Sequence, residues 1–407
     1  MSLEILNDGL PEGWRIALLN EVSDINMGQS PPSSTYNIEG DGLPFFQGKA
    51  EFGLFYPEAK KWCTKPSKIA QKDDVLISVR APVGPTNLAP IECCIGRGLA
   101  AIKPLGDMPS KYLLYYLRNI ETDIDVLGTG STFKAISGKI LRSIQVPVAP
   151  PEQQRRIVTE IEKQFSRLDE AVANLKCVKA NLKRYKAAVL KAAVQGKLNG
   201  EDSSKWKSTL LGKITTTIRN GYSKKPDAEF GTRIFRISAV RPLELYLEDV
   251  RYLSCPIEEY SKHVVTEGNV LFTRYNGNPE LVGVCAVVPK GCPATVHPDK
   301  LIRVSVPKEI LLPGMLALLA TSGEGREYIK SKIRTTAGQS GISGGDLKAL
   351  PLRIPSLEVQ QKIIDEVKRR LSIVAETETQ VDDNLLRAEG LRQSILKKAF
   401  IGKLVAT

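Results

Sequence analysis

The sequence repeats one long segment of itself half a chain apart. Residues Glu152–Leu198 align without a gap with Glu358–Leu404 at an offset of 206 positions, and twelve of the 47 pairs are identical. Both segments close in Gly-Lys-Leu, and the same offset pairs Ile136-Ser137-Gly138 with Ile342-Ser343-Gly344. A repeat of this length is a two-fold duplication and not a short-period solenoid, so the chain is expected to fold as two similar halves.

Each half opens with a mixed region of roughly 150 residues, a usual domain size. At the starts the offset is 192, which sets Trp14 opposite Trp206, so the second half is longer in its middle. Gly and Pro breaks separate short β-like runs such as "DVLISVR" (Asp74–Arg80) and "NVLFTR" (Asn269–Arg274). One helix is predicted in each region, at Ser110–Ile120 and Pro313–Lys332. The pattern predicts a mixed α/β, or α+β, domain.

The repeated segment itself predicts a long helix. No Pro or Gly lies between Glu152 and Gln195, and apolar residues recur with a seven-residue repeat. Gly196 and Gly402 stand where C-terminal caps belong. Such a helix is about 70 Å long, whereas a 150-residue domain has a radius of gyration of about 15 Å. The second domain is therefore too small to join parallel helices, and the chain is predicted to form two long antiparallel coiled-coil helices with a pseudo-two-fold internal repeat.

These features divide the chain into four parts. We predict a globular domain at residues 1–150, a long helix at 151–199, a second globular domain at 200–356 and a second long helix at 357–407. Two similar mixed domains would then lie at opposite ends of the helix pair, like a dumbbell.

Charge favours an acidic polymer as partner. The chain has 57 Lys and Arg against 45 Asp and Glu, a net charge of +12. Residues 1–151 hold 15 basic and 16 acidic residues, whereas residues 152–200 hold 11 and 5. The span Lys176–Leu198 has seven basic residues and no acidic one. A solvated helix face explains such a run equally well.

The residues of common catalytic and metal sites are scarce. With two histidines and seven cysteines at no zinc-site or disulfide spacing, His-based metal sites and Ser-His-Asp triads are disfavoured. "GTGSTFK" (Gly128–Lys134) fails as a phosphate loop, because Phe133 precedes the lysine and Ala135 follows it. We therefore expect no catalytic, cofactor or metal site in this chain. The cysteines are expected to be small buried residues of a cytoplasmic protein, and no apolar run is long enough to span a membrane.

The ordered motifs of the two halves resemble those of one family. They are "VPVAPPEQQRRIV" (Val146–Val158), "RIPSLEVQQKII" (Arg353–Ile364), "VLKAAVQGKL" (Val189–Leu198), "ILKKAFIGKL" (Ile395–Leu404) and "STFKAIS" (Ser131–Ser137). With the domain openings Pro11–Val22 and Ser203–Ile214, they resemble the specificity (S) subunits of type I restriction–modification systems, and the resemblance covers essentially the whole chain.

The resemblance implies a non-catalytic DNA specificity subunit. Domains 1–150 and 200–356 would be target recognition domains, each recognising one half of a bipartite site in double-stranded DNA. The helices would set the spacing and dock methyltransferase (M) subunits, and a restriction (R) subunit can join the complex. S-adenosylmethionine, and ATP with Mg for restriction, would bind to those partner subunits and not to this chain.

Candidate DNA-binding residues are polar side chains in loops at matching places of the two halves, since Arg, Lys, Asn and Gln recognise base edges and also hold phosphates. For each one alone, a phosphate contact or a solvated surface position remains an alternative to base recognition. The candidates are Gln47, Lys49, Arg80, Arg97 and Lys134 in the first half, and Arg233, Arg236, Arg274, Asn276 and Gln339 in the second.

The one-sided charge of the first long helix suggests a surface for a partner subunit. Its candidate residues are Lys176, Lys179, Lys183, Arg184 and Lys191. Two other functions stay open at this point. One is a coiled-coil spacer protein that joins two domains binding ligands other than DNA. The other is a stand-alone DNA methyltransferase or nuclease with unrecognised motifs.

Overall fold

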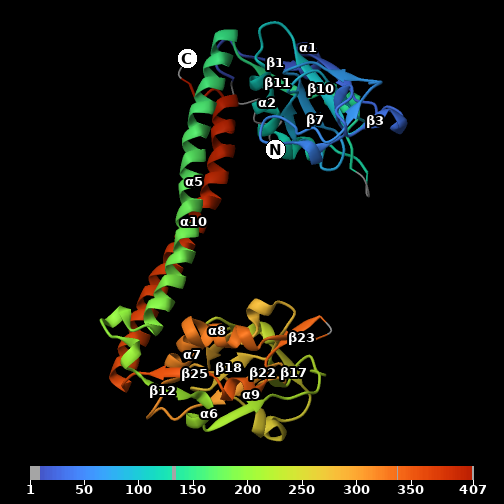
Figure 1. The fold of residues 1–407 in the computed structure, drawn as a ribbon. Helices are drawn as coiled ribbons and strands as arrows, with labels where there is room; N and C mark the ends of the chain where they lie inside the picture. Colours follow the sequence, from blue (N-terminus) through green and yellow to red (C-terminus); the bar gives the residue numbers. More distant parts are fainter. Residues whose placement is uncertain (1–9, 131–133, 337, 406–407) are drawn as a thin grey trace. The chain divides into compact units, whose positions relative to one another are not determined.

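The computed structural model describes residues 10–130, 134–336 and 338–405. The chain divides into two compact units. Unit 1 comprises Met1–Lys176 and Asp382–Thr407, and unit 2 comprises Cys177–Val381. Each unit is a mixed α/β domain joined to segments of two long helices, α5 (Pro151–Val194) and α10 (Leu357–Phe400), which confirms the predicted fold class (Figure 1).

Unit 1 is built around the sheet β2-β10-β7-β8 and a second sheet, β3-β5-β4-β9-β6, while β1 pairs with β11. Its strands are β1 (Arg15–Leu18), β2 (Ser23–Met27), β3 (Tyr36–Asn37), β4 (Leu43–Phe46), β5 (Trp62–Cys63), β6 (Ile69–Ala70), β7 (Val75–Ser78), β8 (Thr86–Leu88), β9 (Cys93–Ile95), β10 (Leu99–Pro104) and β11 (Gln145–Val148). Its short helices are α1 (Leu19–Val22), α2 (Ser110–Asn119), α3 (Glu121–Val126) and α4 (Gly138–Arg142).

Unit 2 repeats this plan with the sheet β13-β22-β18-β20 and the pair β12–β25, and it adds the small sheet β19-β24-β23. Its strands are β12 (Lys207–Leu210), β13 (Thr217–Asn220), β14 (Thr232–Phe235), β15 (Val240–Arg241), β16 (Glu244–Leu245), β17 (Val250–Leu253), β18 (Val270–Thr273), β19 (Tyr275–Asn276), β20 (Cys285–Val287), β21 (Thr295–Val296), β22 (Leu301–Ser305), β23 (Arg334–Thr336), β24 (Gln339–Gly341) and β25 (Pro351–Ile354). Its short helices are α6 (Leu211–Ile214), α7 (Pro313–Thr321), α8 (Gly323–Lys332) and α9 (Gly344–Lys348).

Main-chain pairing shows the duplication directly. Arg15 lies opposite Val148 in β1–β11, and Lys207 lies opposite Ile354 in β12–β25. These partners differ by the two sequence offsets, 192 and 206. In both units one parallel pair, β4–β9 or β14–β21, accompanies otherwise antiparallel strands. The duplication predicted from the sequence is therefore confirmed at the level of strand register.

One helix prediction was wrong. Ser110–Ile120 forms α2 as expected, but Pro313–Lys332 is two helices, with Ser322 extended between α7 and α8. Gly323 adopts a left-handed φ of +63°, and a Cβ there would lie 2.8 Å from the Val194 side chain. A Gly with these constraints ends α7 and lets the chain turn closely past the end of α5.

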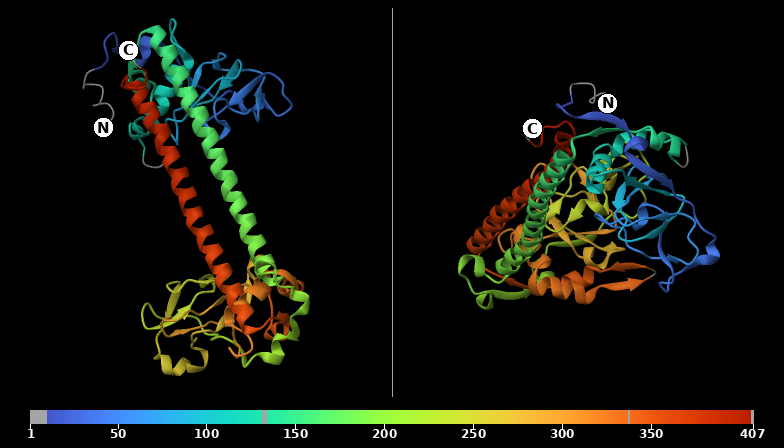
Figure 2. Two further views of the ribbon diagram at one scale, coloured as in Figure 1. Left: turned by 90° about the vertical axis from the view of Figure 1, so that its left-hand side faces the viewer. Right: turned by 90° about the horizontal axis from the view of Figure 1, so that it is seen from above.

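Segments of α5 and α10 pack antiparallel within each unit (Figures 1 and 2). In unit 1 the start of α5 meets the end of α10, where the Arg392 guanidinium lies 5.0 Å from the Phe165 ring centre. In unit 2 the end of α5 meets the start of α10, and Arg370 donates to the Tyr185 hydroxyl at 3.5 Å. Both predicted glycine caps are left-handed, with φ of 76° at Gly196 and 72° at Gly402.

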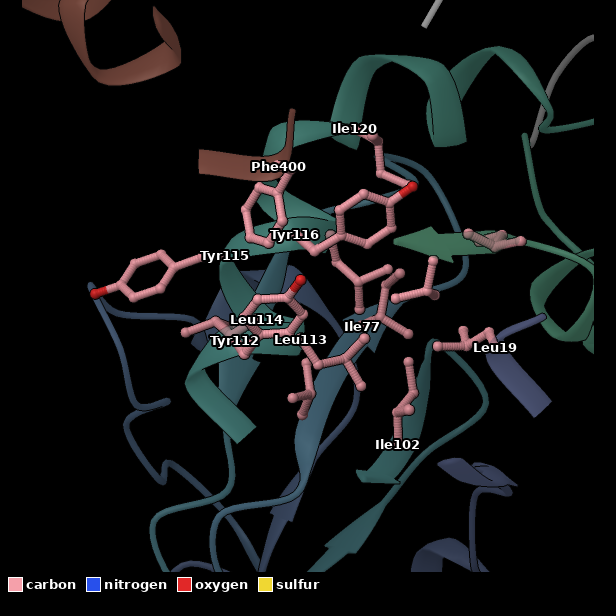
Figure 3. Close-up of a cluster of buried hydrophobic side chains, with 14 of the residues drawn as sticks. Leu19, Ile77, Ile102, Tyr112, Leu113, Leu114, Tyr115, Tyr116, Ile120 and Phe400 are labelled. Atoms are coloured by element: carbon pink, nitrogen blue, oxygen red, sulfur yellow. The ribbon is translucent and has the colours of Figure 1, made fainter. Parts of the chain in front are cut away.

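The end of α10 is part of the unit 1 core. Tyr112 and Tyr116 from α2 each place a ring centre 5.2 Å from that of Phe400 in edge-on contacts (Figure 3). Their hydroxyls donate to the carbonyls of Pro147 (2.9 Å) and Gln145 (2.6 Å) on β11. These hydrogen bonds remove the cost of burying the two hydroxyls. The ring contacts with Phe400 hold the end of α10 against the domain.

One cysteine contradicts the expectation of burial. Cys63, Cys93, Cys94 and Cys285 are buried, and Cys255 and Cys292 are half-buried, but Cys177 is exposed on α5. The Asn181 side chain, one turn further along the helix, contacts its Sγ at 3.7 Å and leaves it exposed.

Candidate DNA-binding surface

Four of the five candidate residues of the first domain surround one open cleft of about 240 Å³. Gln47, Lys49, Arg80 and Arg97 line it together with Ser30. They come from loops that follow β4, β7 and β9, and Ser30 follows β2. We call this group the unit 1 loop cluster. Residues far apart in the sequence thus meet at one end of the sheets.

Glycines allow these loops to approach each other so closely. A Cβ on Gly98 would lie 2.1 Å from the carbonyl oxygen of Gln47, and one on Gly28 would lie 2.2 Å from that of Gly96. Main-chain hydrogen bonds then hold the loops, from Val79 N to Gly98 O (2.9 Å) and from Gly28 N to Leu99 O (2.9 Å). The backbone frame of the cluster therefore depends on glycine and not on the polar side chains.

The cluster presents cations that no carboxylate neutralises among the described residues. Lys49, Arg80 and Arg97 are exposed, and the structure records ion pairs for none of them. The nearby Glu51 carboxylate accepts a hydrogen bond from Gly48 N at 3.1 Å. The fifth candidate, Lys134, is half-buried and forms an ion pair with Asp125 at 2.6 Å, so its charge is locally balanced. Ser131–Phe133, in the glycine-rich loop before it, lie outside the described residues.

Unit 2 holds the same backbone frame with other side chains. Gly221 N donates to Leu301 O (3.2 Å) as Gly28 N does to Leu99 O, and Arg274 N donates to Lys300 O (2.8 Å) as Val79 N does to Gly98 O. Strand register adds that Phe46 corresponds to Phe235. Three counterparts follow at the cluster: Arg236 for Gln47, Tyr275 for Arg80 and Asp299 for Arg97. Together with Asn276 they define the unit 2 loop cluster.

Several candidate residues of the second domain already have partners within the protein, so they are less available to bind DNA. Arg233 pairs with Glu248 (3.3 Å) and Arg236 with Asp249 (3.4 Å), so both guanidiniums have carboxylate partners. Arg274 corresponds to buried Val79; its guanidinium lies 4.6 Å from the Tyr275 ring centre. The sheet β19-β24-β23 brings the other two together, because Asn276 pairs with Ser340, next to the exposed Gln339.

Sequence reasoning missed Ser30, Tyr275 and Asp299. A signal for the first was present, since "Gly-Gln-Ser" at Gly28 and "Gly-Tyr-Ser" at Gly221 recur at the start of the same loop. A signal for Tyr275 was present too, because the gap-free match of Asp74–Ser78 with Asn269–Thr273 places it opposite Arg80. Asp299 was hidden because the loop lengths differ between the halves.

A buried histidine lies beneath the unit 2 loop cluster. His297 is fully buried, and its Nδ1 lies 2.6 Å from the carbonyl oxygen of His263, to which it donates. Burial, with the positive charge of Arg303 nearby, lowers the pKa of His297 to about 4. Its Nε2 has no hydrogen-bond partner among the described residues. The ring is therefore neutral at pH 7 and serves as a core side chain, as its counterpart Ile95 does.

The five candidate partner-binding residues lie on the outer face of α5. Lys176, Lys179, Lys183, Arg184 and Lys191 are all exposed. Arg184 also contacts the Asn181 side chain at 3.4 Å. Buried positions of the same helix, such as Ile161 and Val189, face the domains and α10. The basic residues are thus accessible, while the apolar repeat is used for packing.

The described residues contain no group of three or more His, Cys, Asp or Glu side chains placed to hold a metal ion. None of their helices is both long enough and apolar enough to cross a membrane.

Comparison with known proteins identifies the family. The model of the type I restriction modification DNA specificity domain matches residues 11–184. The type I restriction enzyme EcoKI specificity subunit of Escherichia coli (strain K12) is 30% identical, over 98% of this chain and 90% of that protein. The chain belongs to the specificity subunits of type I restriction–modification systems. The resemblance of the helix and domain motifs is thereby confirmed.

Other specificity subunits match parts of the chain more strongly. The putative MjaX specificity subunit of Methanocaldococcus jannaschii is 42% identical over 46% of this chain and 44% of that protein. The crystal structure of the HsdS subunit from Thermoanaerobacter tengcongensis is 51% identical over 40% of this chain and 41% of that chain, with a TM-score of 0.37. These matches span less than half of each specificity subunit.

Proposed function

We propose that the two loop clusters of this specificity subunit bind double-stranded DNA, each contacting one half of a bipartite target. The observation that carries the proposal is the cleft formed by Gln47, Lys49, Arg80 and Arg97, with its unneutralised cations. Cations of this kind hold phosphates and, as bidentate arginines, recognise guanine. A glutamine beside them can bond adenine in the same groove.

The repeated frame supports a bipartite target. The two clusters share a backbone arrangement but differ in side chains at matching positions, as Arg97 and Asp299 do. Two sites that share a frame can dock on DNA in a similar way, while different side chains favour different bases. We expect the two half-sites to differ in sequence for this reason.

The chain's part in the enzyme is proposed to be recognition and not catalysis. Methyltransferase subunits would dock on the basic face of α5, at Lys176, Lys179, Lys183, Arg184 and Lys191, and would bring S-adenosylmethionine. A restriction subunit with ATP and Mg would join this assembly inside the cytoplasm. The support is the accessible, one-signed face of the helix and the family to which the chain belongs.

Reconstitution tests this function. The chain is co-expressed with the methyltransferase subunit of its own system, and methylated bases are mapped across the host genome with and without this chain. The expected result is one bipartite motif that is modified only when the chain is present. Unchanged methylation in its presence, despite a stable complex with the methyltransferase, would overturn the proposal.

A second measurement separates DNA binding by the assembly from binding by the free chain. Because residues 1–151 carry nearly balanced charge, the free chain is expected to bind random duplex DNA weakly and with strong salt dependence. Fluorescence anisotropy against salt concentration measures this. Tight binding of the free chain to random DNA that salt does not weaken would contradict it.

A further inference from the structure

Unit 2 contains an apolar groove that the recognition function does not explain. It has a volume of about 720 Å³ and lies between α7, the first half of α10 and the turn joining β15 to β16. Its lining includes Leu243 from that turn, Leu318 from α7, and Ile364, Val367 and Leu371 from α10. We call it the α7–α10 groove. An apolar hollow of this size on a long helix is a usual form of docking site.

Aromatic side chains fill the matching place in unit 1. The first turns of α2 and α7 match, because Tyr112 N donates to Pro109 O and Met315 N donates to Leu312 O, both at 2.9 Å. Tyr115 is therefore the counterpart of Leu318, and the helix repeat pairs Phe165 with Leu371.

In unit 1 these rings pack on one another and on a third. Tyr115 and Phe165 have ring centres 5.7 Å apart, and Phe55 lies edge-on to Tyr115 at 6.3 Å. Phe55 comes from the loop that bonds edge strand β8, and Leu243 comes from the turn that bonds the corresponding strand β20. Tyr115 and Phe165 thus correspond to Leu318 and Leu371, which line the open groove of unit 2 together with Leu243.

The charged side chains at the groove also differ from those at the matching place in unit 1. In unit 1 the Glu162 carboxylate on α5 pairs with Lys111 on α2. The counterparts in unit 2 are Lys368 and Gly314, both in the groove lining. Lys186, Lys290 and Lys308 also line the groove, against Glu244 and Glu267. Within the described part of the chain, the structure pairs Lys308 and Lys368 with no carboxylate.

We propose that the α7–α10 groove docks a segment of the methyltransferase subunit that carries an aromatic side chain beside carboxylates. The aromatic ring would occupy the space that the unit 1 rings fill, and a carboxylate would meet Lys368 where unit 1 has Glu162. The proposal rests on the proposed function, which places that subunit on the long helices. Unit 1 fills its own counterpart with aromatic side chains, so this contact is made at unit 2 alone.

Photo-crosslinking tests contact directly. The photoreactive aromatic residue p-benzoylphenylalanine is incorporated at Leu371 in the full chain, which is assembled with the methyltransferase subunit and irradiated. The matched control carries it at Leu386, an exposed position of the same helix outside the groove. We expect a crosslink from position 371, and not from 386, to a methyltransferase peptide that contains an aromatic and an acidic residue. A crosslink only within the chain, or none, would overturn the proposal.

Substitutions that fill the groove test how much it contributes to binding of the methyltransferase subunit. Leu371→Phe copies the unit 1 side chain, and Lys368→Glu copies its acid; Leu386→Phe is the control. Native mass spectrometry across a concentration series then follows binding of the methyltransferase subunit. We expect Leu371→Phe with Lys368→Glu to weaken binding of the methyltransferase subunit at unit 2 by about 30-fold, a value typical of a buried aromatic contact and an ion pair, while Leu386→Phe leaves binding unchanged. Equal binding by the filled variant overturns the groove proposal alone, because assembly with the methyltransferase subunit would still support the proposed function. Absence of binding by the unaltered chain would overturn both.

Discussion

The two loop clusters share a backbone and differ in their side chains. In both, a glycine at the start of one loop passes within contact distance of the loop before β10 or β22, and equivalent main-chain hydrogen bonds hold the loops. The cations of the unit 1 cluster have no carboxylate partner within the described part of the chain, whereas the unit 2 cluster pairs Arg236 with Asp249 and replaces Arg97 by Asp299. Glycines and main-chain hydrogen bonds therefore hold the backbone frame of both clusters. The exposed positions can therefore change charge without changing the fold.

The largest expected difference between the clusters concerns DNA affinity. Arg80→Ala combined with Arg97→Ala is expected to weaken binding of the assembled complex to its target by about 100-fold or more, because each lost contact of this kind costs about 1–3 kcal/mol. Arg236→Ala should cost less than tenfold, because its guanidinium already has a carboxylate partner. Fluorescence anisotropy at fixed salt measures both.

In the same variants, the slope of affinity against salt concentration distinguishes a phosphate contact from a base contact. Loss of a phosphate contact lowers the slope by about one for each charge, whereas loss of a base contact leaves it nearly unchanged and relaxes the sequence preference. Equal losses for Arg236→Ala and for the unit 1 double variant would remove the distinction between the two clusters.

The second largest expected difference concerns stability at the junction between each domain and its long helix. Gln360 is fully buried and makes three hydrogen bonds, accepting from Leu312 N (2.8 Å) and donating to Ile310 O and Pro355 O (both 3.0 Å). Its counterpart Gln154 makes one side-chain bond, to Ala149 O at 2.7 Å. Gln360→Ala strands more buried polar groups, and each stranded group costs about 1–3 kcal/mol.

We therefore expect Gln360→Ala to destabilise unit 2 by about 3 kcal/mol and Gln154→Ala to destabilise unit 1 by about 1 kcal/mol. Urea-unfolding midpoints of the full chain, with amide hydrogen exchange to assign each loss to its unit, measure the difference. If both variants lose the same stability, the three-bond junction of unit 2 has no special role.

Acid should affect unit 2 through a residue that unit 1 lacks. The folded pKa of His297, about 4, is below the ordinary value of 6.5, so the unfolded chain binds the proton more tightly. The contribution of neutral His297 to the stability of unit 2 is complete above pH 6.5 and is lost as the pH falls toward 4. Burial also lowers the pKa of His263, in the same direction, and the cations Arg219 and Arg303 face this pair.

The matched variant is His297→Ile, since Ile95 holds the corresponding position in unit 1. Between pH 7 and pH 5 the unaltered chain should lose about 2 kcal/mol more stability in unit 2 than the variant does. Urea midpoints at the two pH values give this difference, and a pH dependence equal in both proteins would refute the assignment to His297.

Regular features of the chain could be predicted from the sequence, because they depend on patterns that repeat. The gap-free offset of 206, the long stretch without Pro or Gly, and the caps Gly196 and Gly402 were enough for both helices and their antiparallel packing. The break at Ser322–Gly323 was missed, because it depends on the close approach of Val194, more than 100 positions away.

Site residues were harder for a related reason. Gln47, Lys49, Arg80 and Arg97 were named singly as polar loop residues, and that they line one cleft is a finding of the structure. The equivalence of Asp299 with Arg97 could not be found, since it depends on hydrogen-bond register across loops of unequal length. The ion pairs of Arg233 and Arg236 were also hidden, because their acids lie on another strand or loop.

The smallest expected effect concerns the two tryptophans that open the halves. Trp14 donates its Nε1–H to the Gln153 side chain at 2.9 Å. Trp206 holds the corresponding position, but its Nε1 is buried without a partner among the described residues, and the counterpart of Gln153 is Val359. Val359→Gln should supply the missing acceptor and stabilise unit 2 by about 1 kcal/mol, while Gln153→Val should destabilise unit 1 by a similar amount. Urea midpoints test both signs. The indole N–H proton resonance of Trp206 should shift only if the bond forms, so stabilisation without that shift would point to packing, and loss of stability would show that the longer side chain does not fit.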